Sequence, residues 1–136
     1  MSGMSSIKKR WAQWSSILLV LLGMGFGISM LPTGYSEDLS VIGSGKNVAV
    51  LVHNKEGVRS LISMGQVDDI RGHYKDRIEF RIAESGTPTG AEFAKINRAH
   101  EGTLVLFKED GTIAGKLSDL ESSADLTKRL DQAFGY

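Results

Sequence analysis

The apolar positions in the last two thirds of the chain form short, regularly spaced runs. Residues 48–52 (VAVLV) are continuously apolar, as in a strand buried on both faces, and residues 103–107 (TLVLF) form a similar run. In residues 78–84 (IEFRIAE), apolar and polar side chains alternate, which is typical of a strand with two different faces. The turn KEDG followed by residues 112–117 (TIAGKL) predicts a hairpin. The pattern therefore predicts four strands.

Three helices are predicted around these strands. The first covers residues 56–74, with a kink near Gly65 because glycine weakens a helix. The second begins after Thr87, a capping residue followed by proline, and runs to about residue 100. The third follows a serine cap at Ser122 or Ser123. The apolar side chains at helical spacing in the first helix are Val58, Leu61, Ile62, Val67, Ile70 and Tyr74.

The predicted order is β-α-β-α-β-β-α, preceded by a polar, glycine-rich stretch that includes a possible edge strand at Val41–Ile42. A right-handed crossover makes the first two strands parallel, and the final hairpin adds antiparallel strands. The sequence therefore predicts an α/β domain over residues 47–136, with a four-stranded mixed sheet and helices on both faces.

An uncharged segment of 21 residues, 11–31, precedes this domain. At about 1.5 Å per residue, a helix of this length spans a hydrocarbon core of roughly 30 Å. Basic residues 8–10 come immediately before it and favour a cytoplasmic amino terminus. We therefore expect residues 1–10 to be cytoplasmic, 11–31 to form a transmembrane helix and 32–46 to form a linker. This topology predicts a single-pass protein of a bacterial-type inner membrane with a periplasmic domain.

Two further predictions concern the apolar segment: whether it is cleaved, and which of its residues contact another membrane helix. A cleavable signal peptide is the alternative to an anchor, with Gly27 and Ser29 as small residues before a cut. In an anchor, Gly23 and Gly27 form a G-x-x-x-G pattern, and Ser16 lies one heptad before Gly23. Small residues on one face allow two membrane helices to approach closely, so these three residues are candidates for a transmembrane contact.

Charge and cysteine content exclude several function classes. Three of the 16 basic side chains precede the apolar segment, which leaves 13 against 16 acidic ones in the remainder. This mildly acidic domain lacks the basic surface of a nucleic-acid binder. The chain contains no cysteine, so it forms no disulfide and no thiolate metal site. Because the thiolate is the attacking species in disulfide exchange, thiol-disulfide oxidoreductase activity is excluded as well.

The stretch GTLVLFKEDGTIAGKL (residues 102–117) resembles the thioredoxin hairpin, in which Pro-Thr precedes an apolar strand that ends in Phe-Lys. The order of elements over residues 46–134 is also similar to the thioredoxin fold. Two departures stand out. The position of the redox motif is occupied by HNKEGVRS, without a thiol, and Gly102 replaces the proline that is cis in the family. A cis bond before a non-proline residue costs about 2.5–4 kcal/mol, so we expect a trans bond there.

The resemblance implies that two polar segments lie side by side at one edge of the sheet. One is the loop after the first strand, and the other is the turn before the third strand. Their spacing matches no metal motif, so we expect no metal and no cofactor. The candidate binding residues are His53, Asn54, Lys55 and Glu56 in the loop and His100, Glu101 and Gly102 in the turn.

Two functions of different classes follow from these residues. The first is a redox-inactive, membrane-anchored thioredoxin-like domain that binds a protein, as an accessory subunit or assembly factor of a membrane complex or with another envelope protein. Its lipid contact is formed by residues 11–31. The second is an enzyme without thiol chemistry, a hydrolase or metal-dependent, with His53 or His100 as the general base.

Overall fold

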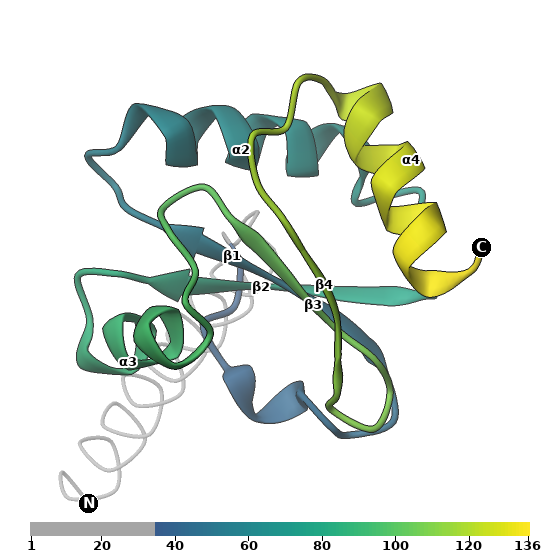
Figure 1. Cartoon of the computed structure of the whole chain (residues 1–136), viewed down its shortest axis with the longest axis horizontal. Helices are drawn as coiled ribbons and strands as arrows, with labels where there is room; N and C mark the ends of the chain where they lie inside the picture. Colours follow the sequence, from purple (N-terminus) through teal and green to yellow (C-terminus); the bar gives the residue numbers. More distant parts are fainter. Residues whose placement is uncertain (1–34) are drawn as a thin grey trace, which may run out of the picture. The chain divides into compact units, whose positions relative to one another are not determined.

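The computed structural model describes residues 35–136, in which four strands form one mixed sheet (Figure 1). The strands are β1 (Asn47–His53), β2 (Ile78–Glu84), β3 (Leu104–Phe107) and β4 (Ile113–Leu117). The helices are the short 3-10 helix η1 (Leu39–Val41), α2 (Val58–Ile70), α3 (Pro88–Ile96) and α4 (Ser123–Phe134). The element order of the α/β prediction is confirmed.

The strand order in the sheet is β2-β1-β3-β4. β1 and β2 are parallel, in a register that runs from Asn47 opposite Ile78 to His53 opposite Glu84. β3 pairs antiparallel with both β1 and β4. The carboxyl ends of β1 and β2 and the amino end of β3 therefore meet at one edge of the sheet.

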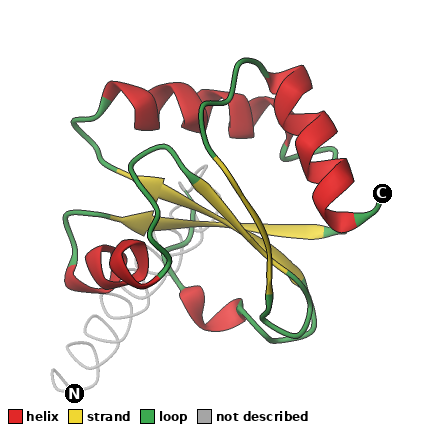
Figure 2. Cartoon of the chain, viewed as in Figure 1, coloured by secondary structure: helices red, strands yellow, loops and turns green. Residues whose placement is uncertain are grey.

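The helices cover the two faces of the sheet (Figure 2). One core lies between the sheet and the helices α2 and α4, and it includes Val67, Leu126 and Leu130. The other lies between the sheet and α3, and it includes Phe93 and the three β1 valines. Alternate β1 side chains enter opposite cores because successive residues of a strand point to opposite faces.

The predicted helix caps are present. The Thr87 hydroxyl accepts a hydrogen bond from the Gly90 backbone N–H at 3.1 Å, with Pro88 at the first helical position. The Ser122 hydroxyl accepts from the Asp125 N–H at 3.0 Å, which decides between the two serines. Each cap satisfies a backbone donor that has no partner within its own helix.

Three local predictions were wrong. Residues near Val41 form η1 instead of an edge strand, because the Asp38 carboxylate caps a helical turn there. α2 continues through Gly65 without a break and ends at Ile70, two residues before Gly72. α3 ends at Ile96, and Arg98 then adopts a positive φ of 49°, which no α-helix accommodates.

The predicted membrane anchor lies outside the described residues. This applies to the whole of segment 11–31, including Ser16, Gly23 and Gly27, and to its alternative as a signal peptide. No helix within residues 35–136 combines the length and the apolarity needed to cross a membrane.

Candidate functional site at the carboxyl ends of β1 and β2

The structure places the β1–α2 loop beside the turn before β3. The Gly102 N–H donates to the Val52 carbonyl at 2.9 Å, and the Val52 N–H donates to the Thr103 carbonyl at 2.9 Å. A long side-chain contact, from Asn54 Nδ2 to Glu101 Oε2 at 3.4 Å, joins the two segments. The structure thus brings together the two polar segments that the sequence picked out.

Asn54 organises the loop. Its Oδ1 accepts from the Glu56 N–H at 3.1 Å, its carbonyl accepts from the Gly57 N–H at 2.9 Å, and its own N–H donates to the Ser60 hydroxyl. This is the local pattern by which an asparagine side chain replaces a backbone turn. The side chains of Lys55 and Glu56 remain exposed to solvent.

Two glycines allow the loop and the turn to approach each other. A Cβ on Gly57 would lie 1.7 Å from Glu101 Oε1. Gly102 has a φ of +81°, which favours glycine, and its carbonyl accepts from the Ser63 hydroxyl at 3.0 Å. The described chain contains no cis peptide bond, so the bond before Gly102 is trans, as expected.

The sequence analysis placed His53 in the exposed loop, and this prediction was wrong. His53 is the buried last residue of β1. Its side chain is only 8% exposed. Its Nδ1 lies 2.8 Å from Oε2 of Glu84, the residue directly opposite in the parallel β1–β2 register. His100, in contrast, is exposed in the turn. The last position of a strand shares the burial of that strand, which explains the difference.

Glu84 is an essential part of this arrangement that the sequence analysis did not identify. Burial alone would raise the pKa of its carboxyl. The hydrogen bond and charge of His53, together with the backbone N–H and charge of Lys55, outweigh that effect, so the pKa of Glu84 lies below its ordinary value. An ionised carboxylate accepts hydrogen bonds only, so His53 Nδ1 is the donor.

The other ring nitrogen of His53 has no partner. Nε2 is buried and makes no hydrogen bond in the described structure. A carboxylate behind Nδ1 is how a histidine base is oriented in many enzymes, but a base must also reach its substrate. His53 has the orienting carboxylate, but its buried Nε2 cannot reach a substrate in this conformation.

A groove of about 260 Å³ lies next to the turn. Its walls come from the start of α2, from the turn and from the loop after β4. The lining residues are Arg59, Ile62, Ser63, His100, Glu101, Gly102, Thr103, Ser118, Asp119 and Leu120. Apolar side chains, both charges and backbone polar groups are therefore all accessible in one depression.

The first half of α2 exposes its large aliphatic side chains. Val58 is 70% exposed, and Leu61 and Ile62 are each 56% exposed. The buried positions of this half are Ser60 and Ser63, whose hydroxyls bind the backbone of the loop and of the turn. Small polar residues are needed there because α2 packs against polar backbone at this point.

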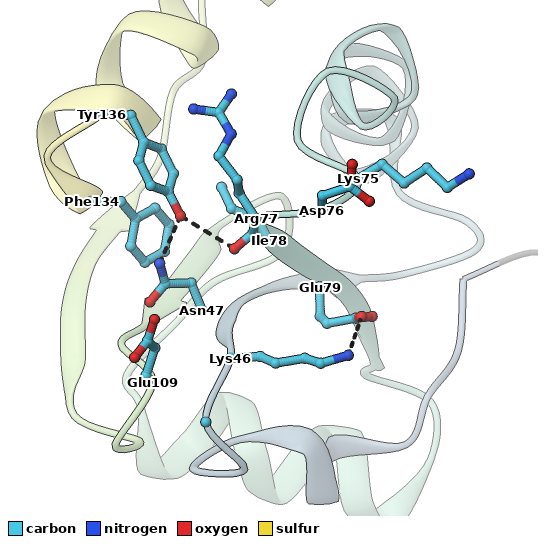
Figure 3. A pocket seen from close by; sticks show the side chains of 11 residues that line it. Lys46, Asn47, Lys75, Asp76, Arg77, Ile78, Glu79, Glu109, Phe134 and Tyr136 are labelled. Carbon is cyan, nitrogen blue, oxygen red and sulfur yellow. Dashed lines mark hydrogen bonds and ion pairs between the residues drawn. The ribbon is translucent and has the colours of Figure 1, made fainter.

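A second crevice, of about 720 Å³, lies at the opposite end of β1 and β2 (Figure 3). Lys46 pairs with Glu79 at 3.2 Å, and the Tyr136 hydroxyl accepts from Asn47 Nδ2 at 2.7 Å. The Arg77 guanidinium lies 4.5 Å from the centre of the Tyr136 ring. The basic side chains that line the crevice are balanced by the acidic side chains of Asp76, Glu79 and Glu109. The crevice therefore does not favour an anionic ligand.

Metal binding finds no support in the described part of the chain. Within residues 35–136, no three His, Asp or Glu side chains are grouped closely enough to hold an ion. The buried pair of His53 and Glu84 supplies two potential ligands at most.

Comparisons with known proteins define the fold but no family. No protein-family model matches the chain, and no curated protein matches it. A solved structure described as "Structure of a malarial protein" is similar, with a TM-score of 0.55 and 16% sequence identity over 65% of this chain and 97% of that chain. At this identity the likeness shows the α/β fold alone.

Proposed function

We propose that this chain is a redox-inactive, thioredoxin-like protein that binds another protein at the edge formed by residues 53–56 and 100–102. The parallel pairing of β1 with β2 and the antiparallel hairpin of β3 and β4 support the resemblance to the thioredoxin fold. The absence of cysteine leaves the edge without a thiol. Recognition of a protein, in place of disulfide exchange, is the use that we propose for this surface.

One observation carries the proposal: within the described residues, the edge offers an accessible surface but no accessible histidine that is oriented by a carboxylate. The groove beside the turn exposes Ile62, His100 and Leu120 together with backbone polar groups. Such a mixture of apolar and polar groups is typical of the surfaces that proteins use to bind one another. The only histidine with an orienting carboxylate, His53, keeps its free nitrogen buried.

We assign the partner to a membrane complex, or to another envelope protein, because of residues 11–31. Their uncharged length and the basic residues before them favour an anchor that holds the domain on the extracytoplasmic side. An accessory subunit or an assembly factor requires both an anchor and a protein-binding surface.

Affinity purification of the full chain in mild detergent tests this function. The unmodified chain is expected to recover a partner protein in constant ratio, and Glu101→Lys is expected to abolish the recovery. Glu109→Lys, which makes the same charge change in the opposite crevice, serves as the matched control and should recover the partner normally. The proposal fails if the chain purifies alone, or if both variants recover the partner equally.

Amino-terminal sequencing of the same sample tests the anchor, because a mature terminus near Met30 would show a cleaved signal peptide.

An enzyme without thiol chemistry is the second candidate, and the pair of His53 and Glu84 is the observation in its favour. Glu84 would orient the ring, and a movement of the β1–α2 loop would have to expose Nε2 before His53 could act as a base. The double variant His53→Ala/His100→Ala separates the two functions. Loss of a measurable turnover with retained folding and partner recovery would favour the enzyme, whereas loss of partner recovery alone would favour the binding protein.

A further inference from the structure

We propose that protonation of His53 opens the β1–α2 loop, so that acid weakens binding at the edge proposed for the partner. The inference rests on the proposed function for its effect on the partner, whereas the opening of the loop does not depend on that function. It is carried by a buried nitrogen without a hydrogen-bond partner and by a carboxylate that the histidine shares with the loop.

The next proton that His53 takes up goes to a buried atom. Because ionised Glu84 accepts a hydrogen bond from Nδ1, that nitrogen already carries hydrogen in the neutral ring, and Nε2 is the basic one. Nε2 is buried and has no hydrogen-bond partner in the described part of the chain. Protonation thus converts a buried acceptor without a partner into a buried, charged donor without a partner. An unsatisfied charged group costs more than a neutral one.

The β1–α2 loop is bound directly to this pair. The Lys55 N–H, two residues after His53, donates to the carboxylate of Glu84, which also accepts from the histidine. The other backbone bonds of the loop are local or go to a side chain, and none goes to the backbone of a neighbouring strand. The Asn54 N–H donates to the Ser60 hydroxyl, the Glu56 N–H to Asn54 Oδ1 and the Gly57 N–H to the Asn54 carbonyl.

The loop is therefore the element at this edge that opens most easily. β1 lies between β2 and β3 in the sheet, so it is held on both sides. The loop, in contrast, has exposed side chains at Lys55 and Glu56 and few bonds to the rest of the domain. Segments of this kind open locally at a lower free energy than central strands do.

The open and closed forms of the loop differ in their affinity for the proton. Movement of the loop would allow water to accept from Nε2–H. The contact of His53 with Glu84 would persist, because the two residues end adjacent strands in one register. The open form therefore binds the proton more tightly than the closed form does. A ligand that prefers one of two conformations shifts the population towards it, so a fall in pH favours the open loop.

The other charged side chains at this edge do not account for such a shift, with one exception. His53 faces α2, because it alternates along β1 with Ala49 and Leu51 of the core on that side. β3 contributes no titratable side chain. Among the side-chain types present, only histidine ordinarily changes its charge between about pH 5 and pH 8, so His100 is the exception. The charged or titratable residues of the surrounding elements are Glu84 on β2, Lys55 and Glu56 in the loop, Arg59 on α2, and His100 and Glu101 in the turn.

Amide hydrogen exchange of the full chain in mild detergent tests the opening of the loop. Rates measured at about pH 7.5 and about pH 5.5 are each divided by the intrinsic rate at that pH, which gives a protection factor. We expect the protection factors of residues 54–57 to be about tenfold lower at the acidic pH. The amides of Lys108 and Gly111, at the opposite end of β3, should show no change. Equal protection of residues 54–57 at both pH values would overturn the inference.

Two substitutions assign the proton to one histidine. His53→Gln takes up no proton in this range, although its amide can still donate to Glu84, so its loop should keep its protection at both pH values. His100→Ala removes the other histidine of the edge and should lose protection as the parent chain does. A loss in His53→Gln as large as that of the parent, or no loss in His100→Ala, would exclude His53 as the group that controls the loop.

Nitrogen-15 chemical shifts of the histidine rings give the same assignment without a substitution. In the unmodified chain, the pH midpoint for protonation of His53 Nε2 should coincide with the midpoint for the loss of protection in residues 54–57. Midpoints that differ would contradict the coupling of the proton to the loop. This measurement remains decisive if His53→Gln does not fold.

Affinity purification at the two pH values tests the effect on the partner. Recovery by the parent chain should be about tenfold lower at the acidic pH. The ratio of the two recoveries should be close to one for His53→Gln, whatever its recovery at neutral pH. Recovery by the parent that stays constant while the loop opens would overturn the effect on binding. If no partner is recovered at either pH, the proposed function fails, and the loop measurement is still read on the chain alone.

Discussion

Two histidine–glutamate combinations lie at the same edge of this protein, and they differ in almost every physical respect. His53 and Glu84 end two adjacent parallel strands, are buried and form a 2.8 Å contact. His100 and Glu101 lie in the turn before β3, where His100 is exposed and Glu101 is half-buried. The same residue types thus support the interior in one place and lie at an accessible surface in the other. Position in a strand or in a turn, rather than chemical type, decides which.

The largest expected effect comes from breaking the buried pair. Glu84→Ala leaves His53 Nδ1 and the Lys55 N–H without their acceptor, and each buried donor left unsatisfied costs about 1–3 kcal/mol. We expect the free energy of unfolding, measured by urea denaturation, to fall by about that amount. A loss below 1 kcal/mol would show that the pair is not a structural element of the interior.

Two glycines near these pairs provide a second test. A Cβ on Gly90 would lie 1.9 Å from the Glu84 backbone carbonyl, which cannot move without distorting β2. Gly90→Ala is therefore expected to cost about 3 kcal/mol. A Cβ on Gly57 would instead meet the end of the Glu101 side chain, which can rotate away. Gly57→Ala should cost less than about 1 kcal/mol. Similar losses for the two variants, in parallel urea titrations, would contradict the contrast between a fixed and an adjustable neighbour.

The strands, their parallel and antiparallel relation and the two capped helices could be predicted, because each leaves a local pattern in the sequence. The neighbourhood of the loop and the turn was implied by the resemblance to the thioredoxin fold. Glu84 was missed because its role depends on a cross-strand register that no local pattern records. The outward face of α2 was missed for a related reason. Helical periodicity groups Val58, Leu61 and Ile62 on one side, but it does not say that the loops require serines on the other.

Acid should weaken the buried pair. The pKa of Glu84 in the folded chain is lower than its ordinary value of 4.5. The unfolded chain therefore binds more protons between these two values, and the stability that Glu84 contributes is present above pH 4.5 and is lost as the pH falls through the folded pKa.

Asp38, Glu79 and Asp110 have lowered pKa values too. The comparison of the parent chain with Glu84→Gln isolates the contribution of Glu84. We expect unfolding curves recorded from pH 6 to pH 3 to show a shallower acid loss in the variant, and equal slopes would refute this.

The smallest effect is expected in the exposed turn. His100→Ala removes a side chain that makes no hydrogen bond or ion pair within residues 35–136, so the free energy of unfolding should change by less than about 0.5 kcal/mol. The thermal midpoint of His100→Ala, compared with that of the parent chain, checks this value. A large loss would mean that the turn is a structural element like the buried pair.

Amide hydrogen exchange of the complex with its recovered partner, compared with the chain alone, tests the central claim most directly. The account predicts slower exchange in residues 54–57, 100–103 and 118–120, which form the loop, the turn and the groove wall, and unchanged exchange in residues 75–79 at the opposite end of the sheet. Protection at residues 75–79 with no change at the loop and the turn would contradict it, because the partner would then bind elsewhere.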